Sequence, residues 1–163
     1  MAALNSGTQA PQVALPDLKG KTVSLSVELK RGPVVLAFFK ISCPVCQYAL
    51  PILERLHRAY PNAAIYGVSQ NSAKDTESFR REFGVTFPML LDDPNTYTAS
   101  NAYGLTNVPT VFYIGQDGTI EVSSVGWSKS DVEEIGRRLG AAPNVSVTPL
   151  FKPGEEVADF RAG

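Results

Sequence analysis

The stretch from Gly32 to Pro61 changes its hydrophobic period at a pair of closely spaced cysteines, Cys43 and Cys46. Residues 34–39 (VVLAFF) form a continuous run of β-branched, aliphatic and aromatic side chains, which is typical of a strand buried on both faces of a sheet. After the first cysteine, apolar residues recur at helical spacing, at Val45, Ala49, Ile52, Leu53 and Leu56. The sequence therefore predicts a central strand that leads into an amphipathic helix, with both cysteines at the first turn of that helix.

Two prolines fall inside this predicted helix. Pro44 suits the first turn, because the N–H group that proline lacks would have no helical partner there. Pro51 lies in the interior, where a proline removes a hydrogen bond, and it predicts a kink. Pro61 and Asn62 end the helix.

Strands and helices alternate along the middle of the chain. We expect, in chain order, a strand at 63–70, a helix at 75–84, a strand at 87–93 and a short helix at 96–104. Ser72 is the expected N-cap of the first of these helices, and Gly84 its left-handed C-terminal residue. This order predicts a strand–helix–strand crossover unit.

The last third of the chain predicts a hairpin and a final helix. Residues 110–125 (TVFYIGQDGTIEVSSV) contain two β-rich runs joined by an Asp-Gly pair, which tolerates positive φ in a tight turn. The helix begins near the segment SKSDVEE, where Ser130 and Glu133 have the spacing of a capping box, and it ends at Gly140. At the other end of the chain, residues 8–25 alternate apolar and polar side chains between prolines, which predicts edge strands and turns that cover the core.

These elements together predict an α/β fold with a central mixed β-sheet flanked by helices. We assign residues 1–140 to one domain and residues 141–163 to an irregular C-terminal tail that returns to pack on the body. The tail segment GEEVADFRAG loosely echoes GTQAPQVALPD near the start of the chain. We interpret it as an extended tail rather than as the start of a duplicated domain.

Composition excludes several classes of function. A chain of 163 residues and 17.6 kDa buries enough surface to be stable without disulfide staples. Its net charge of -1 and scattered charges offer no basic stripe for nucleic acid. The apolar runs are far shorter than the roughly 20 residues that a bilayer demands, and the first residues do not read as a signal peptide. As given, the chain is expected to be a cytoplasmic protein and a monomer. If a leader peptide has been removed from its N-terminus, we expect a periplasmic protein instead.

The predicted position of the cysteines gives them different chemistry. The first N–H groups of a helix and the positive end of its dipole stabilise a thiolate, so we expect the pKa of Cys43 to lie below its usual value of about 8.5. Cys46, one turn deeper, is expected to stay protonated and sheltered. Lys40 either adds positive potential near Cys43 or is simply solvated at the end of the strand.

Two simpler interpretations of the cysteine pair remain open at this stage. A structural zinc ion needs four protein ligands. The chain has only two cysteines and one histidine, His57, so we expect no metal. His57 is expected to be a surface residue of the helix. A structural disulfide across the pair would close a very short loop and would stabilise the fold little.

The segment CPVCQYALPIL resembles the active-site segment of the thioredoxin superfamily, with Pro51 in the place of its helix-kinking proline. The segment NVPTVFYIGQDGTI is similar to the second signature of that superfamily, in which a cis proline faces the cysteines and a hairpin follows. The resemblance implies that Pro109 is cis and that Val108 offers its backbone to an extended substrate. It also implies that Pro44 and Val45 contact the substrate and tune the reduction potential.

The N-terminal segment and the extra strand and helix within residues 66–93 resemble the redoxin branch, which contains peroxiredoxin-type (AhpC/TSA) proteins and TlpA/ResA-like thiol–disulfide oxidoreductases. The resemblance spans about residues 8–140. The chain departs from the peroxiredoxin pattern, because Phe39 and Cys43 stand where a proline and a Thr or Ser would bind peroxide near Cys46. Ala37 and Ala49 stand where relatives carry an acid, so the proton acceptor for Cys46 is not identified.

The sequence therefore predicts a thiol–disulfide oxidoreductase that uses Cys43 and Cys46, needs no cofactor, and exchanges disulfides with dithiol or disulfide proteins. The first alternative is a thiol-dependent peroxidase with an antioxidant role. The second is a redox-inactive interaction module in which the cysteines are structural.

Overall fold

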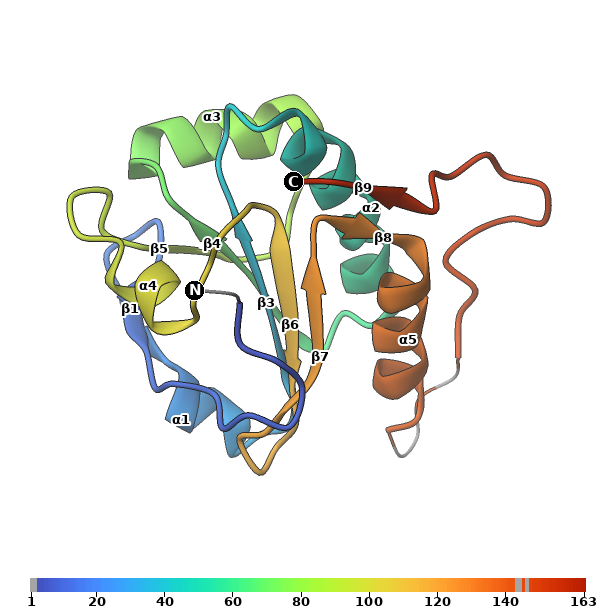
Figure 1. Cartoon of the computed structure of the whole chain (residues 1–163), viewed down its shortest axis with the longest axis horizontal. Coiled ribbons are helices and arrows are strands. Elements are labelled where there is room, and N and C mark those ends of the chain that lie inside the picture. The colour runs from blue at the N-terminus through green and yellow to red at the C-terminus, as the bar shows by residue number, and fades with distance from the viewer. Residues whose placement is uncertain (1–2, 143–144, 146) are drawn as a thin grey trace.

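The computed structural model describes residues 3–142, 145 and 147–163 and is built on a five-stranded sheet with the strand order β5-β4-β3-β6-β7 (Figure 1). The strands are β3 (Val34–Phe39), β4 (Ala64–Ser69), β5 (Met89–Leu91), β6 (Thr110–Ile114) and β7 (Ile120–Val125). β4 runs parallel to β3 and β5, whereas β6 runs antiparallel to β3 and β7. The predicted mixed sheet and the central place of residues 34–39 are confirmed.

Helices cover both faces of this sheet (Figure 1). They are α1 (Leu25–Leu29), α2 (Pro44–Ala59), α3 (Ala73–Phe83), α4 (Thr98–Ala102) and α5 (Lys129–Gly140). The odd-numbered residues of β3 belong to a buried cluster with Leu50 of α2, Phe79 of α3 and Ile135 of α5. The even-numbered residues of β3 belong to a second cluster, with Leu29 of α1 and Ala99 of α4. Both faces of β3 are therefore buried, which explains its unbroken apolar sequence.

The N-terminal segment forms a small antiparallel sheet of its own from β1 (Ala14–Pro16) and β2 (Thr22–Ser24). The predicted edge strands are thus confirmed, but helix α1 directly after them was not predicted. Its five residues make little more than one turn, which is too short for a helical period to be visible in the sequence. Leu25 and Leu29 are buried and fix this turn against the core.

Both ends of α3 follow the sequence prediction. The Ser72 hydroxyl accepts a hydrogen bond from the backbone N–H of Asp75 at 3.2 Å, so it caps the first turn. Gly84 ends the helix with a φ of 67°, in the left-handed region that glycine enters without steric cost.

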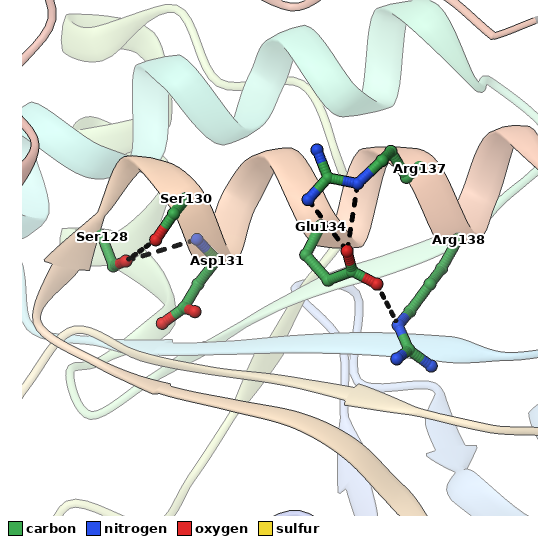
Figure 2. Close-up of polar contacts among 6 residues, drawn as sticks. All are labelled: Ser128, Ser130, Asp131, Glu134, Arg137 and Arg138. Carbon is green, nitrogen blue, oxygen red and sulfur yellow. Dashed lines mark hydrogen bonds and ion pairs between the residues drawn. The ribbon is translucent and has the colours of Figure 1, made fainter.

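The capping box predicted at the start of α5 is wrong. The N-cap is Ser128, whose hydroxyl accepts from the backbone N–H of Asp131 at 3.3 Å (Figure 2). Because the helix starts at Lys129, Ser130 already lies inside the first turn and its hydroxyl contacts that of Ser128 instead. The predicted end of the helix at Gly140 is confirmed.

The predicted hairpin is formed by β6 and β7, and Gly118 in its turn has a φ of 89°. The tail after α5 returns to the body, as expected, and it contains one strand that was not predicted. Strand β9 (Phe160–Arg161) pairs antiparallel with β8 (Trp127–Ser128), just before α5 (Figure 1). The domain boundary at residue 140 stays a prediction.

Within the described ranges, every helix is either too short or too polar to cross a bilayer.

Candidate active site

The two cysteines lie just beyond the C-terminal end of β3, where the chain enters α2. Two side chains hold this connection in place through the backbone of Ile41. Asn71 accepts a hydrogen bond from the Ile41 N–H at 3.0 Å, and the Gln47 amide donates to the Ile41 carbonyl at 2.9 Å. The loop before the cysteines is thus fixed both to the end of β4 and to α2.

Cys43 is the N-cap of α2, and its sulfur faces the open N–H groups of the helix. The Cys43 Sγ accepts a hydrogen bond from the backbone N–H of Cys46 at 3.1 Å. Cys43 is half-buried, so the residue keeps some accessible surface. An N–H donor and the positive end of the helix dipole favour negative charge at this position.

Cys46 lies one turn deeper and has no exposed surface. Burial raises the pKa of the Cys46 thiol far above its usual value, and the hydrogen bond and charge of Cys43 raise it further. Both sulfurs are free thiols in this structure. The predicted difference between a sulfur at the surface and a sheltered, protonated partner therefore has a clear structural basis at Cys46.

The second signature segment lies directly against the first. The Val108–Pro109 peptide bond is cis, as the resemblance implied. The Cys43 thiol donates to the Val108 carbonyl oxygen at 3.4 Å, although the two residues are 65 positions apart in the chain. The Thr110 hydroxyl donates to the Asn107 carbonyl at 2.8 Å and helps to hold this turn beside the cysteines.

The remaining residues predicted for the site lie around this contact. Pro44 is exposed and Val45 is half-buried at the first turn of α2. The Lys40 ammonium group lies over the ring of Tyr97, 5.7 Å from its centroid. Lys40 and Val108 also line a hollow of about 270 Å³, whose other walls are Gln70, Tyr97, Ser100, Asn101, Leu105, Thr106 and Asn107. Lys40 is thus near the site, and its electrostatic effect on Cys43 stays a prediction. Pro51 lies inside α2, and its predicted kink stays a prediction as well.

Glu54 is a buried acid of the same helix, but it does not lie beside the cysteines. It is two turns beyond Cys46, roughly 12 Å along the axis at 1.5 Å per residue. Its carboxylate accepts hydrogen bonds from the backbone N–H groups of Thr86 and Phe87, at 2.8 and 3.2 Å. The two alanines in the positions where relatives carry an acid, Ala37 and Ala49, are fully buried. Glu54 is therefore a structural acid rather than a proton acceptor for Cys46.

The positions that would bind peroxide have no such function here. Phe39 is fully buried, and its ring packs on that of Phe79 with 5.1 Å between centroids. A peroxide molecule has no access to Cys46 in this state, because the sulfur lies beneath the first turn of α2.

The expectation for His57 is wrong in part, because the side chain is half-buried rather than on the surface. Its ring stands edge-on to Phe87 at 6.3 Å, and its Nδ1 atom is buried without a hydrogen-bond partner. Among residues 3–142, 145 and 147–163, no group of three His, Cys, Asp or Glu side chains has the arrangement to hold a metal ion.

Sequence reasoning missed a cluster beside the site that joins α2 to the tail. The Tyr48 hydroxyl accepts from the Ala158 N–H at 3.0 Å, and the Trp127 indole donates to the Ala158 carbonyl at 2.6 Å. The rings of Tyr48 and Trp127 meet edge to face, 5.6 Å apart, and the guanidinium of Arg161 lies 4.2 Å from the Tyr48 centroid. No local pattern links residue 48 to residues more than a hundred positions later, so only the aromatic content of this region gave a signal.

A cysteine pair at a helix N-terminus, opposite a cis proline and on a mixed sheet covered by helices, defines a thioredoxin-like thiol–disulfide oxidoreductase. Residues 6–123 match the AhpC/TSA family, and the chain belongs to that family. It is 30% identical over 135 residues to the thiol-disulfide oxidoreductase ResA of Geobacillus kaustophilus, which covers 80% of this chain and 76% of the relative. It is 29% identical over 134 residues to ResA of Halalkalibacterium halodurans, and the match covers 80% of this chain and 74% of that relative.

A solved structure has a similar fold. The crystal structure of a putative thiol:disulfide interchange protein DsbE from Chlorobium tepidum is similar to this chain with a TM-score of 0.72 and 25% identity. The match covers 84% of this chain and 96% of that one. The predicted redoxin branch and thioredoxin-like fold are confirmed, and the peroxidase alternative gains no support.

Proposed function

We propose that this oxidoreductase exchanges disulfides with partner proteins, with Cys43 as the attacking group and Cys46 as the resolving group. The observation that carries the assignment is the position of the Cys43 sulfur. It accepts from the Cys46 N–H on one side and contacts the Val108 carbonyl on the other. The more accessible sulfur is thus the one that helix dipoles stabilise as a thiolate.

In the first step, the Cys43 thiolate attacks one sulfur of the partner disulfide. A bond forms between Cys43 and that sulfur, the partner's own S–S bond breaks, and the released partner thiolate takes up a proton. The partner chain lies against Val108 and Pro109 and also contacts the exposed Pro44 and the half-buried Val45.

In the second step, Cys46 loses its proton to solvent and attacks the Cys43 sulfur. A Cys43–Cys46 bond forms, and the second partner sulfur leaves as a thiolate. The partner disulfide has gained two electrons, and the cysteine pair has lost two. The exchange needs no cofactor, and another dithiol protein returns the pair to its reduced state. Because the pKa of Cys46 is raised by burial, we expect this second step to speed up as the pH rises.

Reduction of insulin disulfides by the protein, with dithiothreitol as the electron source, tests this assignment. Cys43→Ser is expected to abolish the activity above the rate of dithiothreitol alone. Cys46→Ser is expected to retain the first attack and to accumulate a mixed disulfide with insulin, visible by non-reducing electrophoresis. Equal activity of the parent protein and Cys43→Ser would refute the mechanism.

The comparisons do not support the cytoplasmic placement expected from the sequence. We propose instead that the partners are proteins whose disulfides persist in an oxidising compartment outside the cytosol. The monomeric state stays a prediction.

A further inference from the structure

The last residues of the described chain lie on the surface where the proposed mechanism places the partner. A Cβ atom added to Gly163 would lie 2.3 Å from the Val108 carbonyl oxygen, so the backbone of Gly163 packs directly on that group. The Asn107 amide donates to the Gly163 carbonyl at 3.0 Å. The same Val108 oxygen accepts the Cys43 thiol hydrogen bond, so the tail and the reactive sulfur contact one atom.

The tail reaches this point as an added β-strand. In the β8–β9 pair, Arg161 is the register partner of Trp127, and the Lys129 N–H donates to the Asp159 carbonyl at 2.9 Å. Gly126 makes room for the strand, because a Cβ there would lie 2.5 Å from the Arg161 carbonyl oxygen. An extended segment paired with an open edge is a general way in which domains bind peptides.

One side chain of this strand marks a recognition point next to the cysteines. The guanidinium of Arg161 lies over the ring of Tyr48, 4.2 Å from its centroid, and Tyr48 follows Cys46 by two residues in α2. A cation over the face of a tyrosine ring is attracted to it, and at an exposed site this attraction is modest. The surface thus fits an extended chain with a basic side chain over Tyr48 and a small residue over Val108.

The tail is held firmly up to Ala158 and weakly beyond it. Upstream, Arg55 forms two hydrogen bonds with Glu155, at 3.1 and 2.8 Å, and Ala158 is bonded through both its N–H and its carbonyl. From Asp159 to Gly163 every residue is exposed, and the paired strand has only two residues. Residues 159–163 are therefore tethered to the docking surface by the firmly held Ala158. The tether keeps the local concentration of this segment high, while each of its own contacts stays weak.

We propose that residues 159–163 occupy the partner's docking strand in the resting dithiol protein and compete with the partner for it. This inference rests on the proposed function. The partner class that follows is a disulfide protein whose extended segment beside the cysteine carries an Arg or Lys to replace Arg161 and a small residue to replace Gly163. Occupancy of the site by the tail lowers the apparent affinity for every partner, because the intrinsic affinity is multiplied by the fraction of molecules in which the site is free.

The test is Arg161→Pro in the full chain, because proline lacks the N–H needed for strand pairing and also removes the cation over Tyr48. With insulin as substrate, KM is expected to fall by about 3- to 10-fold with kcat unchanged, as removal of a competing segment requires. Arg161→Ala keeps the backbone N–H and is expected to lower KM by a smaller factor. Lys152→Ala, at an exposed tail residue outside β9, is the matched control and should leave KM unchanged.

A small uncharged substrate, hydroxyethyl disulfide, distinguishes competition by the tail from a change in the reactivity of the cysteines. It has no chain to place on β8, so its second-order rate constant should be the same in all four proteins. An insulin KM that is unchanged or raised in both Arg161 variants would overturn the competition. That result is distinct from failure of the proposed function, in which the parent protein would not reduce insulin at all.

Discussion

Cys43 and Cys46 have the same side chain in opposite surroundings. Cys43 is a helix N-cap with accessible surface, whereas Cys46 is sealed beneath the first turn. The proposed order of reaction rests on this difference, because only an accessible thiolate can meet a partner disulfide. Glu54 illustrates the same dependence on surroundings at a residue outside the chemistry. Burial by itself raises its pKa, but hydrogen bonds from Thr86 and Arg58 lower the pKa below its usual value.

Glu54→Gln is expected to lower the free energy of unfolding at pH 7 by about 1–3 kcal/mol, because a carboxamide cannot accept from all the donors around this buried group. The pKa of Glu54 is lower in the folded state, so the unfolded state binds more protons and the stabilisation is lost as the pH falls below about 4.3. The gap between the parent and Glu54→Gln should therefore shrink toward pH 3. Urea unfolding between pH 3 and pH 7 measures this gap, with Glu82→Gln at an exposed position as the control. A gap that is constant with pH would contradict the assignment.

At the scale of elements, the start of α5 shows how a shift of two residues changes which side chain caps the helix. The helix begins at Lys129, so Ser128 caps it, and Ser130 does not (Figure 2). Further along, Glu134 bonds to both Arg137 and Arg138, which stabilises the exposed face of the same helix (Figure 2). Capping and surface pairs therefore act at separate places on one element.

Ser128→Ala is expected to lower the free energy of unfolding by about 1 kcal/mol, the usual effect of losing an N-cap hydroxyl. Ser130→Ala, two residues away, is expected to change it by no more than about 0.5 kcal/mol. Chemical denaturation followed by circular dichroism measures both. A loss in Ser130→Ala as large as or larger than that in Ser128→Ala would contradict the assignment of Ser128 as the cap.

The elements with the clearest signal in the sequence have a long period or a specific end residue. β3, α2 and α3 were visible because six or more residues repeat one pattern, and Ser72 and Gly84 because their positions have a strict conformational demand. Helix α1 and strand β9 were missed because each is fixed by contacts with distant residues and has only five and two residues of its own. Short elements of this kind depend on tertiary structure more than on local propensity.

At the scale of the whole molecule, the tail and α2 form one packed unit. Arg55 joins them through Glu155 and through the Leu150 carbonyl, at 3.0 Å, and its guanidinium lies over the ring of Phe151. The pair with Glu155 is partly exposed, so each contact is modest, but they act on the same segment.

Arg55→Met is expected to speed hydrogen exchange of the Ala158 amide, because the segment that presents it to Tyr48 loses its main fixed point. The amides of β3 should keep their protection, and global stability should fall by no more than about 1 kcal/mol. Hydrogen exchange followed by NMR measures both. Arg81→Met, at an exposed arginine of α3, is the control. Unchanged exchange at Ala158 would show that Tyr48 and Trp127 hold the tail without Arg55.

The sequence predicted the residues that we propose to react, but not the residues that surround them. Cys43, Cys46, Val108 and Pro109 lie together as the two signature segments implied, because each signature is local. Ala37 and Ala49 already indicated in the sequence that the usual acid beside Cys46 is missing, and the structure adds that the carboxylate of Glu54 is bonded elsewhere. The tail on the docking surface depends on contacts between residues 48 and 158 and between residues 107 and 163, and such distances have no local signature.

Trp127 is the only tryptophan of the chain, it is almost fully buried, and its indole N–H is bonded to the tail at Ala158. The tryptophan emission of the protein is therefore a single-site optical signal from the junction between the tail and the cysteine helix. Any event that lifts Ala158 from this indole should wet it and shift its emission to longer wavelength, so release of the tail as far back as Ala158 can be followed in real time without a label.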